Sequence, residues 1–178
     1  LWVAAGLIGI AVWAVFIERQ LFVIRKQSVK VLPSGSQPIR VLQIGDIHLA
    51  PWQKNKMRFL RSLGSKEIDL VVNTGDNLGH KNAIKPLLDA LGSLLSKPGV
   101  FVHGSNDYFA PVPKNPFGYI FHSSAKPNSA ALETQELTAG FEKAGWVNLN
   151  NRFADVDVNG TRVRFLGIDD YHIGYSKF

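Results

Sequence analysis

The chain has 178 residues, which is enough for one domain of ordinary size. Hydrophobic residues make up 46% of it and charged residues only 19%, which excludes disorder as a description of the whole. The absence of cysteine excludes disulfides, thiolate zinc sites and cysteine nucleophiles, and a net charge of +6 is too small by itself to indicate nucleic-acid binding. The chain begins at Leu1, inside an apolar run and without Met, so we expect a fragment of a longer protein.

Residues 1–17 form an uncharged apolar run, which we interpret as a transmembrane helix. A core helix would show a polar stripe and a cleaved signal peptide would end at small residues, and the run has neither feature. Residues 18–38 read as a basic juxtamembrane linker in which Glu18 is the only acid. The positive-inside rule then predicts a single-pass membrane protein whose following domain lies on the cytoplasmic side. The basic residues of the linker are Arg19, Arg25, Lys26 and Lys30.

From Ile39 onward the apolar pattern alternates between strands and helices. This alternation indicates right-handed βαβ crossovers and a largely parallel sheet, so the predicted fold class is α/β. A hairpin is expected near the end of the chain, because Asn159-Gly160 suits a two-residue turn. The predicted strands cover residues 39–44, 68–73, 100–103, 152–158 and 161–168; the predicted helices cover 54–63, 83–95 and 133–144, and a loop covers 111–127.

A polar cluster follows each of the first three predicted strands. The carboxyl ends of neighbouring parallel strands line one crevice of an α/β sheet, and ligands bind in that crevice. Carboxylate, imidazole and amide side chains together suit Mn²⁺, Fe or Zn²⁺ better than Ca²⁺. Each cluster alone also fits a common turn, but their joint order predicts a metal site. The clusters are Gly45-Asp46-Ile47-His48, Gly75-Asp76-Asn77 and Gly104-Ser105-Asn106-Asp107.

These motifs, in this order, resemble those of the calcineurin-like metallophosphoesterase superfamily, and most closely its bacterial membrane-anchored phosphohydrolases. The family pattern is Asp-x-His, Gly-Asp, Gly-Asn-His-Asp/Glu, a later His and Gly-His-x-His. The resemblance implies an αββα sandwich over residues 39–178 that is incomplete at its C-terminus, because the last two motifs do not follow the hairpin. It also implies hydrolysis of phosphate esters by two divalent metal ions (Mn, Fe or Zn) and a bridging hydroxide. Without the later histidines, the chain as it stands is expected to be poorly active.

The resemblance also assigns roles position by position. Asp46 and His48 would bind the first metal, Asp76 would bridge both metals, and Asn106 would bind the second. The third motif departs from the family because its usual histidine is absent, and an alternative register places Ser105 at the ligand position. Another residue must then give a proton to the leaving group. The candidates for this catalytic role are Asp107 and His80.

The sequence leaves the substrate and one rival interpretation open. A membrane-lipid phosphate is worth testing as substrate, because the predicted anchor would place site and lipid on one surface. The rival is a membrane-tethered binding module with a degenerate, inactive metal site, which the altered third motif favours and the first two motifs oppose. A nuclease is a third possibility, but anionic lipid explains the basic residues beside the apolar run equally well. His103, His122 and the run 169–172 are expected to be structural.

Overall fold

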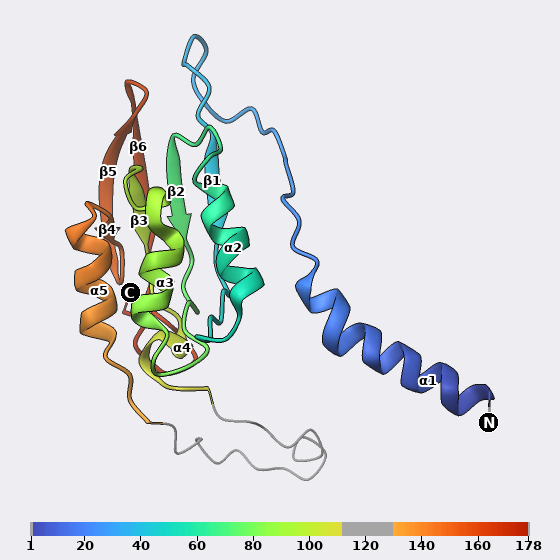
Figure 1. Cartoon of the computed structure of the whole chain (residues 1–178). Coiled ribbons are helices and arrows are strands. Elements are labelled where there is room, and N and C mark those ends of the chain that lie inside the picture. The colour runs from blue at the N-terminus through green and yellow to red at the C-terminus, as the bar shows by residue number, and fades with distance from the viewer. Residues whose placement is uncertain (1, 112–129, 178) are drawn as a thin grey trace.

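The computed structural model describes residues 2–111 and 130–177 as a parallel sheet, a layer of helices and a separate hairpin (Figure 1). The sheet has the strand order β1-β2-β3-β4, and every pairing in it is parallel. The predicted α/β class with a parallel sheet is therefore confirmed. The strands are β1 (Val41–Ile44), β2 (Leu70–Asn73), β3 (Gly99–Phe101) and β4 (Val147–Asn148).

Three amphipathic helices supply the apolar layer that packs against the sheet (Figure 1). They are α2 (Lys54–Leu63), α3 (Ile84–Leu91) and α5 (Thr134–Lys143). Their buried side chains recur at helical spacing and join Val71 of β2 and Phe101 of β3 in one core. Because each crossover returns the chain to the start of the next strand, the loops after β1, β2 and β3 meet at one edge of the sheet.

Helix α3 is shorter than the predicted helix over residues 83–95. It ends at Leu91, and a 3₁₀ turn, η3 (Gly92–Leu94), replaces the last predicted turn. Gly92 has a φ of 37°, outside the right-handed helical region, and this conformation interrupts the α-helix.

The predicted hairpin is confirmed as β5 (Arg152–Val158) and β6 (Thr161–Gly167), which pair antiparallel. A Cβ atom at Gly167 would lie 2.8 Å from Cγ1 of Val102, so the end of β6 packs tightly beside the end of β3. An αββα sandwich would also have a layer of helices over the outward face of the hairpin. Residues 2–111 and 130–177 contain no helix at that position (Figure 1). Phe153 and Leu166 on that face are 66% and 79% exposed.

The structure does not support the transmembrane helix predicted over residues 1–17. Helix α1 (Trp2–Val12) spans about 17 Å at ~1.5 Å per residue, against a hydrocarbon core of about 30 Å. The hydrogen-bond pattern changes after Val12, where the π-helical η1 (Trp13–Ile17) and the 3₁₀ turn η2 (Glu18–Gln20) follow. Within residues 2–111 and 130–177, no helix is long and apolar enough to cross a membrane.

Part of the predicted loop over residues 111–127 cannot be compared with the structure. Residues 112–129, and His122 with them, lie outside the described residues.

Candidate metal centre

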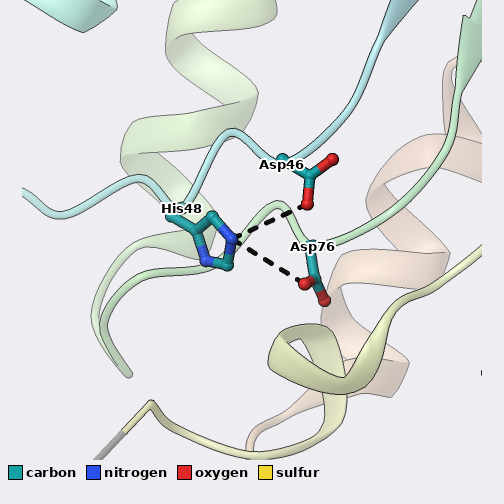
Figure 2. Close-up of side chains that lie close together, drawn as sticks. All are labelled: Asp46, His48 and Asp76. Atoms are coloured by element: carbon teal, nitrogen blue, oxygen red, sulfur yellow. Dashed lines mark ion pairs between the residues drawn. The ribbon is translucent and has the colours of Figure 1, made fainter. Parts of the chain in front are cut away.

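Three side chains from the loops after β1 and β2 converge at the carboxyl edge of the sheet (Figure 2). Nε2 of His48 lies 3.9 Å from Oδ1 of Asp46 and 3.7 Å from Oδ2 of Asp76. Two ligand atoms at about 2.1 Å from one ion are separated by at most about 4.2 Å, so both spacings fit a shared ion. The two carboxylates and the imidazole also form a donor set that suits Mn²⁺, Fe or Zn²⁺.

The backbone is held in an unfavourable conformation at the same three residues. Asp46, His48 and Asp76 have φ values of 50°, 43° and 53°. The left-handed region costs a non-glycine residue about 1–2 kcal/mol. The other non-glycine residues with positive φ among the described residues are Asn151 and Asn159, and both lie in turns. Strain concentrated where ligand side chains meet indicates a functional site.

Close packing between the loops holds this conformation. The amide of Asp46 donates to the carbonyl oxygen of Gly75 at 2.9 Å, and the amide of His48 donates to that of Asp76 at 3.0 Å. Gly75 has a φ of 89°, and a Cβ atom there would lie 2.4 Å from the amide nitrogen of Gly104. A Cβ atom at Gly104 would in turn lie 2.2 Å from Oδ1 of Asp76. Both glycines are therefore needed to bring the three loops together.

Asn106 holds the carboxylate of Asp76 from the third loop. It lies on α4 (Ser105–Tyr108), a single helical turn that the sequence did not predict. Its amide donates to Oδ1 of Asp76 at 2.9 Å, and its side-chain nitrogen donates to Oδ2 at 3.0 Å. Each oxygen of Asp76 keeps a lone pair for a cation. Within the described part of the chain, Oδ1 of Asn106 accepts no hydrogen bond, so it too is available as a ligand.

Asp107, one of the two predicted catalytic residues, is fully buried. Its Oδ1 accepts from the amides of Asn77 and Leu78 at 2.8 and 3.2 Å. Its Oδ2 accepts from the side chain of Asn77 at 3.1 Å and from the amide of Gly104 at 3.2 Å. These bonds tie the loop after β2 to α4 and leave the carboxylate no contact with solvent. This placement favours a structural role for Asp107.

His80, the other predicted catalytic residue, lies partly exposed on the loop after β2. Its Nδ1 accepts a hydrogen bond from the amide of Asn82 at 3.1 Å, which places the proton of the neutral ring on Nε2. The ring packs edge-on against Trp52, with 5.1 Å between centroids. His80 is not part of the converging group of Asp46, His48 and Asp76. A neutral imidazole is too weak an acid to give up its N–H, so proton donation by His80 would require the protonated ring, in which Nδ1 carries a hydrogen and no longer accepts from Asn82.

Lys56 is a residue near the metal group that the sequence interpretation missed. Its Nζ donates to the carbonyl oxygen of Ile47 at 2.6 Å, which holds the chain between Asp46 and His48. Burial lowers the pKa of Lys56, and the nearby positive charge of Arg19 lowers it further. No short motif carries this signal, because the contact depends on where α2 begins relative to the loop.

Residues 169–172 form hydrogen bonds with α4 that hold this turn in place. The hydroxyl group of Tyr108 donates to the carboxylate of Asp169 at 2.8 Å, and the amide of Ser105 donates to Asp170 at 2.8 Å. Burial and the negative charge of Asp169 raise the pKa of Tyr108, so its hydroxyl stays protonated and keeps donating. These contacts agree with the structural role expected of the run.

Comparison with known proteins places this site in a family. A model of the family described as Calcineurin-like phosphoesterase matches residues 39–176, which include the whole converging group and Asn106. The curated proteins and the solved structures gave no match. The bacterial membrane-anchored type stays a prediction. Because the family model covers well over half of the chain, the chain belongs to the calcineurin-like phosphoesterase family.

Proposed function

We propose that this protein hydrolyses phosphate esters with two divalent metal ions. Asp46 and His48 would hold one ion, Asp76 would contact both, and Asn106 would offer its oxygen to the second. The observation that carries the proposal is the convergence of Asp46, His48 and Asp76 on a strained backbone. Family membership supports phosphate-ester hydrolysis as the reaction, because the family model matches the stretch of chain that contains these three residues.

The metal ions and the protein side chains would contribute different steps of the hydrolysis. Bound divalent ions lower the pKa of water and stabilise negative charge on phosphoryl oxygens. The protein supplies the carboxylates that hold the ions, and Asn106 fixes the orientation of Asp76 through its two hydrogen bonds. We assign proton donation to the leaving oxygen to His80 in its protonated form, which gives up the hydrogen bond that Nδ1 accepts from the amide of Asn82 in the neutral ring. Asp107 then keeps the loops in place.

Release of 4-nitrophenol from 4-nitrophenyl phosphate in the presence of Mn²⁺ tests the proposal. Asp76→Asn is expected to lower kcat/KM at least about 100-fold, because it removes a charge that both ions require. Asp89→Asn is the matched control, since Asp89 lies on the exposed side of α3 and pairs only with Lys85 among the described residues. A rate above a few per cent of wild type in Asp76→Asn contradicts the assignment. Mn²⁺ binding without hydrolysis by the wild-type protein supports the binding-module alternative instead.

The leaving group tests the role of His80. Glycerol 3-phosphate releases a poor alkoxide and needs a proton, whereas 4-nitrophenolate departs readily as an anion. His80→Gln is expected to slow glycerol 3-phosphate hydrolysis by roughly 100-fold, with a much smaller loss on 4-nitrophenyl phosphate. His172→Gln, at an exposed histidine, is the control. Equal losses on both substrates would show that His80 does not donate the proton.

Three further predictions concern the architecture of the domain, its substrate and its location. We infer that the parallel sheet and the β5–β6 hairpin belong to the two facing sheets of an αββα sandwich, and the close packing at Gly167 supports this. A membrane-lipid phosphate as substrate and a cytoplasmic location of the domain also stay predictions.

A further inference from the structure

A hollow of about 320 Å³ adjoins the metal group, and the two share the imidazole of His48. One side of it is formed by α2, and the other by the segment that follows α1 and passes beside α2 (Figure 1). Stacking of Phe22 on Phe59, with 5.1 Å between ring centroids, holds that segment against α2. The lining residues are Arg19, Gln20, Phe22, His48, Gln53 and Lys56.

The polar groups around this hollow are mainly hydrogen-bond donors. Nζ of Lys56 gives one hydrogen to Ile47 and keeps two, and the guanidinium of Arg19 carries five. Oε1 of Gln53 accepts from the amide of Ala50 at 3.0 Å, which leaves the side-chain NH₂ group of Gln53 for a ligand. Donors arranged in this way match the oxygens of an anion.

Two positively charged side chains border the hollow. Lys56 is partly buried, and Arg19 is close enough to lower its pKa. Among residues 2–111 and 130–177, neither cation forms an ion pair with a carboxylate. Two neighbouring cations, one of them partly desolvated, repel each other, and a bound anion removes that repulsion.

We propose that Arg19, Gln53 and Lys56 bind a second phosphate group of the substrate, on the same molecule as the phosphate cleaved at the metal group. This inference rests on the proposed function and narrows it to substrates with two phosphate groups. His48 supports it, because its side chain both lines the hollow and lies beside Asp46 and Asp76, so the two phosphates would bind next to one residue. Soluble nucleotides and lipid headgroups both offer this chemistry.

Pairs of substrates that differ by one phosphate test the inference. For the soluble source we would compare adenosine 3′,5′-bisphosphate with adenosine 5′-monophosphate. For the lipid source we would compare phosphatidylcholine vesicles that contain phosphatidylinositol 4,5-bisphosphate or phosphatidylinositol 4-phosphate. Phosphate release with Mn²⁺ gives the ratio of kcat/KM within each pair. We expect wild type to prefer the bisphosphate about 10- to 100-fold in at least one pair, and that pair identifies the source.

Substitutions of the lining residues test whether the hollow causes the preference for bisphosphates. Lys56→Gln and Arg19→Gln are expected to lower the ratio about tenfold each, and Lys56→Arg to retain most of it because the charge remains. Lys54→Gln is the matched control, since Lys54 lies on the same helix but is exposed and does not line the hollow. A wild-type ratio near one in both pairs overturns the inference. An equal ratio in Lys56→Gln and Lys54→Gln overturns it as well.

Calorimetric binding without metal separates this inference from the proposed function. If the protein hydrolyses no substrate, the proposed function fails, and binding of the bisphosphates still decides the role of the hollow. Tighter binding of a bisphosphate than of its monophosphate by wild type, lost in Lys56→Gln and kept in Lys54→Gln, supports the subsite. Equal binding of both members of each pair refutes it, whatever the catalytic result.

Discussion

The substitution Asp107→Asn distinguishes a structural carboxylate from a catalytic one. Asp107 is fully buried, and each of its two oxygens accepts two hydrogen bonds. Asparagine has nearly the same size but keeps only one oxygen. If that oxygen stays with the amides of Asn77 and Leu78, the new NH₂ group faces the side chain of Asn77 and the amide of Gly104, which are both donors.

The expected loss of stability follows from those two bonds. A hydrogen bond to a charged group contributes about 1.5–3 kcal/mol, and leaving a buried donor unpaired costs a similar amount. Two lost bonds therefore predict a destabilisation of about 3–6 kcal/mol. With a denaturant slope of about 2 kcal/mol per molar urea, the unfolding midpoint falls by about 1.5–3 M.

Urea unfolding followed by far-ultraviolet circular dichroism measures this midpoint. Asp89→Asn is again the control, because its exposed i,i+4 pair with Lys85 contributes only about 0.3–0.5 kcal/mol. If Asp107→Asn keeps the wild-type midpoint but loses hydrolysis about 100-fold, Asp107 acts in catalysis and the structural assignment is wrong.

Two further predictions concern the packing of the loops and a surface ion pair. Gly104→Ala should weaken Mn²⁺ binding about tenfold or more, because its Cβ would displace the carboxylate of Asp76; unchanged affinity in a calorimetric titration would refute the close approach. Hydrogen bonds from Arg164 hold the pKa of Asp155 at about 2, below the usual 3.8, so the pair stabilises the fold fully above about pH 4 and loses this effect as the pH falls toward 2. Asp155→Asn should therefore lower the urea midpoint at pH 6 more than at pH 2, and equal shifts would contradict the pairing.

Much of the fold could be predicted from the sequence because apolar periodicity fixes which faces are buried. The predicted helix over 54–63 has the same bounds as α2, and the hairpin turn lies at Asn159-Gly160 as expected. Errors arose where the hydrogen-bond pattern changes without a change in hydropathy. The apolar run at the N-terminus continues through Val12, where the α-helix ends, and nothing in its composition marks that point.

The candidate site could be predicted in part for a related reason. Asp46, His48 and Asp76 follow successive parallel strands, so topology alone brings them to one edge. The position of Asp107 could not be predicted, because it depends on α4, a single turn without apolar periodicity. The closeness of Arg19 to Lys56 could not be predicted either, since it depends on how the N-terminal segment packs on α2.

The Mn²⁺ affinity of the protein shows whether Asp46, His48 and Asp76 form a metal site. We would titrate Mn²⁺ by calorimetry into the wild-type protein, Asp76→Asn and the control Asp89→Asn under one set of conditions. We predict saturable Mn²⁺ binding to wild type and the control, and a dissociation constant at least about tenfold higher in Asp76→Asn. Mn²⁺ binding that is equally tight in Asp76→Asn and wild type, or absent from the wild-type protein, would contradict a metal centre at Asp46, His48 and Asp76.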